Sequence, residues 1–125
     1  MGDEAAKQKA RLEKFRRLND AQKAIQAARV VARKGLNRNP SPEQRRDLDE
    51  NILDLTERIG ILEARILAVR NGGGNDNIAM PSDEQVAETG AILAEVEGLT
   101  NQNITAAGAL ALAIRGANLA REVTA

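Results

Sequence analysis

The sequence predicts an all-α protein, a helical bundle of two antiparallel hairpins with about four helices, joined by a glycine-rich linker. The first observation is composition: 22 of the 125 residues are Ala, and Phe15 is the only aromatic residue. The second is an apolar seam over residues 48–69, whose members recur at alternating spacings of four and three. The third is a pair of helix-start signals at Ser41 and Ser82. Because helix formers abound and strand formers are scarce, we expect one domain, residues 1–125, with closely approaching, Ala-lined helices.

The first expected helix covers residues 3–34. Its packing face contains residues spaced by three and four: Leu18, Ala21, Ile25, Ala28 and Ala32. We expect the helix to end at Gly35, because glycine readily takes the left-handed conformation of a Schellman closure. Leu12 and Phe15 project away from the packing face, so the first part of the helix has apolar residues that this face does not use.

The second expected helix begins at Pro42 and runs to about Arg70. Ser41 and Gln44 have the spacing of a capping box, and Pro42 takes the first helical position. The connection to the first helix is short, so residues 1–70 should form an antiparallel hairpin.

The apolar seam of this second helix has two possible uses. Its members are Leu48, Ile52, Leu55, Ile59, Leu62, Ile66 and Val69. With Ile at position a and Leu at position d, the seam suits a parallel coiled-coil dimer. Leu53, Ile61 and Leu67 lie beside the seam and widen the apolar surface, which is typical of a bundle core. The sequence leaves open whether a bundle uses the whole surface or a partner shares it.

Residues 71–81 form the expected linker. The segment 71–77 contains three consecutive glycines, with no strand before it and no Lys-Ser/Thr after it, which indicates a flexible connection and not a phosphate-binding loop. Ser82 and Gln85 then repeat the capping signal, so a third helix should run to about Glu97. One face of this helix carries Val86, Gly90 and Leu93.

The fourth expected helix, about residues 103–123, completes an Ala-rich C-terminal pair over 82–125. It is apolar nearly all round, which is typical of a central or a bound helix. One face carries Ile104, Ala107, Leu110, Ala111 and Ile114, and another carries Leu112 and Leu119. The alternative is a single kinked helix over 83–123, because no residue between 97 and 103 forbids helix.

The chain has 18 basic and 18 acidic side chains, but they are unevenly distributed. Residues 1–46 carry 13 Lys and Arg against 5 Asp and Glu, and residues 47–125 carry 5 against 13. Two interpretations follow: a basic arm for an anionic partner, or two oppositely charged segments that lie against each other. In the second, bases of the first helix lie near acids of the second, namely Asp47, Asp49, Glu50 and Asp54.

Composition argues against an enzyme and against a bound cofactor or metal. The chain has no Cys and no His, which excludes disulfides, thiol or imidazole chemistry and the usual zinc ligands. Its only serines, Ser41 and Ser82, are both explained as helix caps. The carboxylates are spread along expected helix faces with no apolar pocket around a pair.

These observations predict a non-enzymatic helical module that binds a protein, either a second copy as a homo-oligomer or another partner. The candidate docking residues are Leu12, Phe15, Leu112 and Leu119. The alternative is nucleic-acid binding through basic side chains near the N-terminus, with Lys7, Lys9, Arg11, Lys14, Arg16 and Arg17 as phosphate contacts. Against this alternative, no aromatic platform exists beyond Phe15 for stacking single-stranded bases.

Membrane association is a third hypothesis, and the sequence disfavours it. The uncharged run Ile104–Ile114 is too short to span a bilayer, and Arg115 closes it. The charged first 17 residues do not read as a signal peptide. We expect a cytoplasmic location, although the sequence does not fix the compartment.

Overall fold

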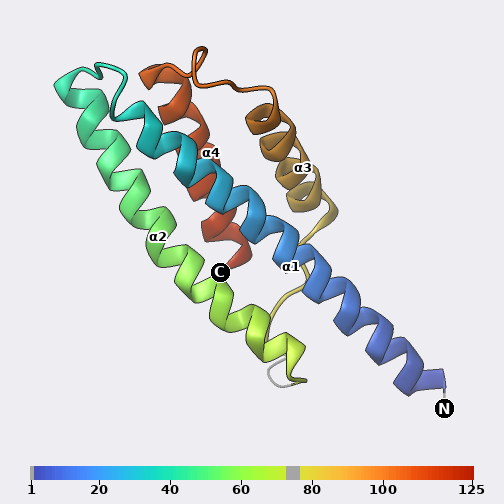
Figure 1. The fold of residues 1–125 in the computed structure, drawn as a ribbon. Helices are drawn as coiled ribbons and strands as arrows, with labels where there is room; N and C mark the ends of the chain where they lie inside the picture. The colour runs from blue at the N-terminus through green and yellow to red at the C-terminus, as the bar shows by residue number, and fades with distance from the viewer. Residues whose placement is uncertain (1, 73–76) are drawn as a thin grey trace.

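The computed structural model describes residues 2–72 and 77–125 and contains four helices (Figure 1). They are α1 (Gly2–Gly35), α2 (Pro42–Arg70), α3 (Asp83–Glu97) and α4 (Ala106–Val123). The described residues contain no β-strand. The predicted all-α bundle of four helices is therefore confirmed.

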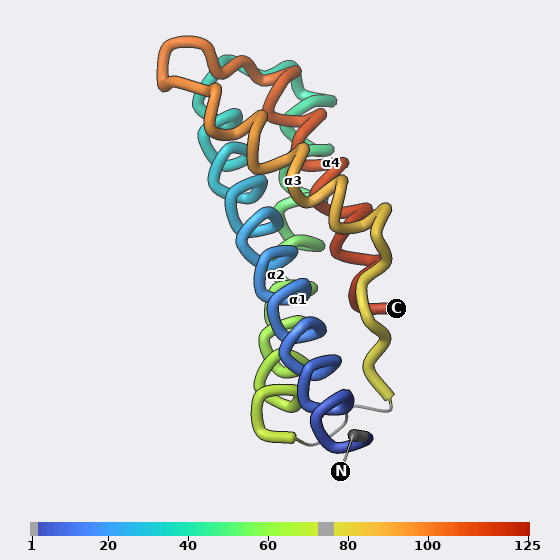
Figure 2. The backbone as a smooth tube through the Cα atoms, turned by 90° about the vertical axis from the view of Figure 1, so that its right-hand side faces the viewer, coloured from blue at the N-terminus to red at the C-terminus, as the bar shows by residue number. Residues whose placement is uncertain are grey.

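Three of the helices form the centre of the bundle. α4 packs on α1 and α2, which also pack on each other, while α3 packs on α1 and α4 and makes no contact with α2. Figures 1 and 2 show α2 and α4 running in one direction and α1 and α3 in the other. The packing therefore does not divide into two separate hairpins, because α4 contacts α1 and α2 more than it contacts its sequence neighbour α3.

The heptad seam of α2 is buried inside this single chain. Its buried members are Leu48, Leu55, Ile59, Leu62, Ile66 and Val69. They share one core with side chains of α1 such as Leu18 and Ile25, and with Ala113 and Ala117 of α4. Since residues of α1 and α4 already cover the seam, it is not available to a second copy as a parallel coiled coil.

Helix starts are where the sequence predicts them when a capping box is present. The backbone N–H of Gln44 donates to Ser41 Oγ at 3.1 Å, and the Ser41 N–H donates to Gln44 Oε1 at 2.9 Å. Ser82 and Gln85 repeat both bonds at 3.1 and 2.9 Å. Each box provides acceptors for two backbone N–H groups at a helix N-terminus, which fixes the first turn.

The start of α4 differs from the prediction. Thr105 is its N-cap and accepts a hydrogen bond from the Gly108 N–H at 3.0 Å, so the helix begins at Ala106 and not near residue 103. Residues 98–105 are non-helical and separate α3 from α4. The alternative of one kinked helix over 83–123 is therefore wrong.

Gly35 also behaves differently from the prediction. It is the last residue of α1, and the positive φ angles in the described chain belong to Asn39 (50°) and Gly72 (81°). A Cβ on Gly35 would overlap the Cβ of Ala109 in α4, and one on Gly116 would lie 2.7 Å from the Cβ of Ala28 in α1. These glycines are needed because α1 and α4 approach each other closely, as the predicted Ala-lined contact requires.

The predicted linker is only partly described, because residues 73–76 lie outside the described chain. The residues that follow are anchored: Ile78 is 8% exposed and belongs to the core, and Pro81 is buried. Arg17 of α1 donates from Nη1 to the Pro81 carbonyl at 2.8 Å. The end of the linker is therefore fixed to α1 before α3 begins.

Candidate docking surfaces

Within 2–72 and 77–125, no three Asp, Glu, His or Cys side chains group so as to hold a metal ion. The Ser41 and Ser82 hydroxyls both accept hydrogen bonds from helix N-termini. No described helix reaches the length and apolar character that crossing a bilayer requires. The helix surfaces are the candidate functional features.

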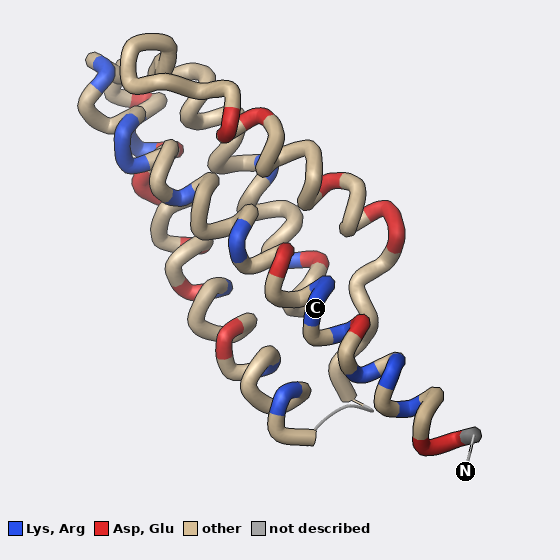
Figure 3. Tube along the Cα trace, turned by 45° about the vertical axis from the view of Figure 1, so that its right-hand side comes forward, with Lys and Arg blue, Asp and Glu red and all other residues tan. Residues whose placement is uncertain are grey.

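Two of the predicted docking residues meet at one end of the bundle. The N-terminal part of α1 extends past the other helices (Figures 1 and 3). Leu12 is 59% exposed there, while Phe15 is half-buried and packs against the core. A groove of about 170 Å³ between α1 and α2 is lined by Arg11, Leu12, Phe15, Val69 and Arg70. Its apolar floor and two guanidinium groups suit an apolar side chain flanked by acids.

The basic side chains predicted to contact phosphate do not form one uniform set. Arg16 and Arg17 both bind Glu13, at 2.5 and 2.9 Å, and Arg17 also binds Asp83 at 3.0 Å. Hydrogen bonds from Arg16 and Arg17 lower the pKa of Glu13, and the bond to Glu13 raises the pKa of Arg17. Arg17 therefore links α1 to the start of α3, whereas the Arg16–Glu13 pair lies within α1.

The remaining predicted phosphate contacts lie nearer the N-terminus. Lys7 and Lys9 are exposed on the extending part of α1, Arg11 lines the groove beside Leu12, and Lys14 is half-buried. Figure 3 marks several basic positions along this end of α1.

The two docking residues predicted on α4 lie in the core. Leu112 is 2% exposed and Leu119 is 1% exposed, so neither has surface free for a partner in this fold. On the other predicted face, Ile114 is 43% exposed and Ala107 and Ala111 are exposed, whereas Ile104 is buried. Leu112 and Leu119, predicted as docking residues, are therefore core residues of α4. An almost uniformly apolar helix has weak periodicity, so spacing alone did not identify its inner side.

The outer face of α2 carries exposed apolar residues that were not among the predicted docking residues. Leu53 is 71% exposed and Leu67 is 49% exposed. Gly60 lies midway between them, and Ala64 is exposed on the same side. A Cβ on Gly60 would meet nothing within 4 Å. The signal available in the sequence was the position of Leu53 and Leu67 beside the seam.

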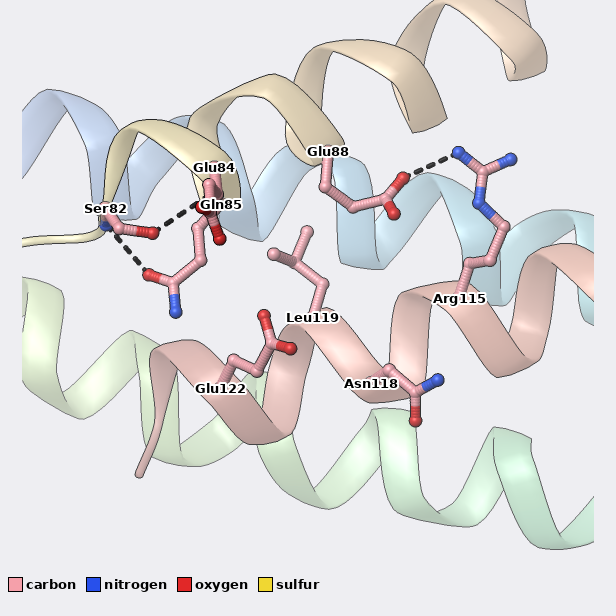
Figure 4. Close-up of a pocket in the computed structure, with 8 residues that line it drawn as sticks. All are labelled: Ser82, Glu84, Gln85, Glu88, Arg115, Asn118, Leu119 and Glu122. Atoms are coloured by element: carbon pink, nitrogen blue, oxygen red, sulfur yellow. Dashed lines mark hydrogen bonds and ion pairs between the residues drawn. The ribbon is translucent and has the colours of Figure 1, made fainter.

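A polar groove of about 400 Å³ separates the start of α3 from the end of α4 (Figure 4). Arg115 of α4 crosses it to bind Glu88 of α3 at 2.6 Å, and it also binds Glu95. The hydrogen bond with Glu88 is the main cause that raises the pKa of Arg115. Because Arg115 of α4 binds two carboxylates of α3, these ion pairs hold α3 against α4 across the groove.

A third groove, of about 330 Å³, lies between α1 and α3. α3 contributes Val86, Thr89, Gly90 and Leu93, and α1 contributes Arg16, Arg17, Asp20 and Lys23. The predicted Val86–Gly90–Leu93 face therefore lines a groove, while Thr89 and Ile92 are the buried residues of α3. Val86 is 38% exposed along its wall.

The charge split is resolved differently from the hairpin interpretation. Asp54 of α2 binds Arg121 of α4 at 2.9 Å, as well as Arg58 of its own helix at 3.5 Å. Asp47 pairs with the adjacent Arg46, at 4.0 Å. The ion pairs of these α2 acids are thus formed within α2 and with α4, while Lys7 and Lys9 of α1 stay exposed.

No protein-family model, curated protein or solved structure matches this chain.

Proposed function

We propose that this chain is a non-enzymatic helical interaction module that binds protein through apolar helix faces. One observation carries the proposal: the core closes without Leu12, Leu53 and Leu67, which stay 59%, 71% and 49% exposed on helices. Single exposed leucines are common on proteins, but two of these share one face of α2 at a helical repeat. Helices that present apolar residues in register are a usual means of binding another helix.

Photo-crosslinking in the cells that make the protein tests this function. A benzophenone amino acid would replace Leu12 or Leu53. In the matched control it would replace Gln26, which is exposed on a polar part of α1. We expect covalent adducts with one defined protein, this chain or another, from position 12 or 53 and not from position 26. Equal adducts from all three positions, or none from any, would contradict the proposal.

The exposed basic end of α1 favours a second candidate, nucleic-acid binding. Lys7 and Lys9 lie on the part of α1 that extends beyond the bundle. Binding of DNA or RNA at this end should weaken steeply with salt, and each phosphate contact removed should lower the slope by about 0.9 on duplex DNA. Lys7→Gln with Lys9→Gln should reduce binding and slope, whereas Lys23→Gln in the α1–α3 groove should not. A slope unchanged by the double variant would rule this function out.

A further inference from the structure

The outer face of α2 has a repeat that the monomer does not use. Leu53, Gly60 and Leu67 are spaced by seven residues, which is close to two helical turns, so they lie nearly in line. Ala64 continues the same side, and all four residues are exposed. The opposite side of α2 carries the buried seam. The helix thus has one apolar face packed in the core and a second, narrower one in solvent.

Gly60 has no explanation within the fold. A Cβ there would meet nothing within 4 Å, whereas Gly35 and Gly116 are required by the close approach of α1 and α4. Glycine inside a helix costs about 0.5–1 kcal/mol relative to alanine. Gly35 and Gly116 mark places where another helix comes close. Gly60 is unpacked, as Gly90 is, but it lies midway between two exposed leucines, so it offers the same possibility to a helix from outside.

We propose that this face binds a second copy of the chain, with two α2 helices antiparallel about a two-fold axis at Gly60. The inference rests on the proposed interaction function and names its partner. Leu53 and Leu67 are equally distant from Gly60, so such an axis places Leu53 of each chain against Leu67 of the other. A face that is symmetric about its own centre is complementary to itself, as a two-fold interface requires.

Charge complementarity favours the antiparallel arrangement. The same register brings Asp49 and Glu50, both exposed, near Arg70 of the second copy, which is exposed at the other end of α2. A parallel pair would place these acids against themselves. Glu57 of one chain approaches Glu63 of the other in the antiparallel register, and this like-charge repulsion makes the dimer weak and concentration-dependent.

Sedimentation of the full chain over a wide concentration range tests the dimer. The native chain should shift from 13.4 kDa towards twice that mass as concentration rises. Leu53→Glu should weaken the dimer at least tenfold, and Glu57→Gln should strengthen it. Val30→Glu is the matched control, because Val30 is 49% exposed on α1 and lies outside the proposed face. Circular dichroism of each variant separates loss of the dimer from loss of folding.

Disulfide trapping tests the antiparallel register, since the native chain has no cysteine. A Leu53→Cys chain mixed with a Leu67→Cys chain should form the mixed disulfide in preference to either homodimer. Preferred 53–53 bonding would overturn the proposed arrangement.

A native chain that stays monomeric at every concentration, or a dimer that Leu53→Glu does not weaken, would overturn the inference altogether. A monomer that still crosslinks another protein through position 53 would overturn only this inference, whereas absence of adducts from every position would contradict the proposed function as well.

Discussion

Gly35 ends α1 and Gly90 lies inside α3, and their surroundings predict opposite effects of the same substitution. A Cβ on Gly35 would overlap Ala109, while a Cβ on Gly90 would meet nothing within 4 Å. Gly35→Ala should therefore lower the free energy of unfolding by about 1–3 kcal/mol, because α1 and α4 must move apart. Gly90→Ala should raise it by about 0.5–1 kcal/mol through helix propensity. Urea unfolding of both variants would check the signs, and a stabilised Gly35→Ala protein would refute the close helix contact.

The sequence predicted a structural role for Gly35 but not its physical cause. Its place at the end of an expected helix suggested a left-handed cap, because that role depends only on neighbours in the chain. The close contact with Ala109 depends on which helix packs against α1, and no local pattern contains that information. Leu112 and Leu119 were misplaced for the same reason, since their burial depends on how α4 is turned in the bundle.

The Glu13 carboxylate of α1 binds Arg17, which also joins α1 to Asp83 at the start of α3. Hydrogen bonds from Arg16 and Arg17 lower the pKa of Glu13 in the folded chain. The ordinary value is about 4.3, so the folded state favours the charged form. The resulting stability is fully present above the ordinary pKa and is lost as the pH falls through the lowered one.

Glu13→Gln should therefore reduce stability at pH 7 and should flatten the loss of stability between pH 5 and acidic pH. The unfolding midpoint in urea at several pH values measures both effects. Glu97→Gln is the control, because Glu97 is exposed at the end of α3 and has no ion pair among the described residues. If the two variants gave the same pH profile, the role assigned to Glu13 would be incorrect.

Helix starts were predictable because their determinants are local. The boxes at Ser41 and Ser82 each need only a serine and a glutamine three residues apart, and both starts agree with the structure. α4 lacks a complete box and uses Thr105 alone, so its start was placed a few residues early. The outer face of α2 was visible in the sequence as leucines beside a seam, but only the arrangement of α1 and α4 shows that nothing in the described chain covers them.

For the whole molecule, the bundle could be predicted but not the order of packing. Heptad spacing shows that α2 needs neighbours, and any helix with an apolar face can supply them. The charge split suggested that α1 neutralises α2, whereas Arg121 of α4 binds Asp54 of α2 in the fold. Which helices pack together depends on the fit between segments that are distant in the chain, above all where Ala and Gly permit α1 and α4 to approach.

This arrangement predicts that α3 opens before the rest of the bundle. α3 makes no contact with α2, and its buried residues are Thr89 and Ile92, against nine buried residues in α4. Arg115 supplies part of its attachment through Glu88 and Glu95. Helices with few buried contacts open locally at lower free energy than the core. In native-state hydrogen exchange, α3 should therefore be the least protected of the four helices outside their frayed ends.

Arg115→Gln should accelerate exchange in α3 by up to about thirtyfold, since it removes two partly exposed ion pairs that contribute about 0.2–1 kcal/mol each. Exchange in the centres of α1, α2 and α4 should change much less, because their opening requires disruption of the three-helix core. Arg121→Gln is the matched control: it removes an arginine–carboxylate contact from the same helix, but that contact joins α4 to α2. Equal acceleration throughout the molecule would mean that α3 and the core unfold as one unit, because only a separate opening of α3 confines the effect to that helix.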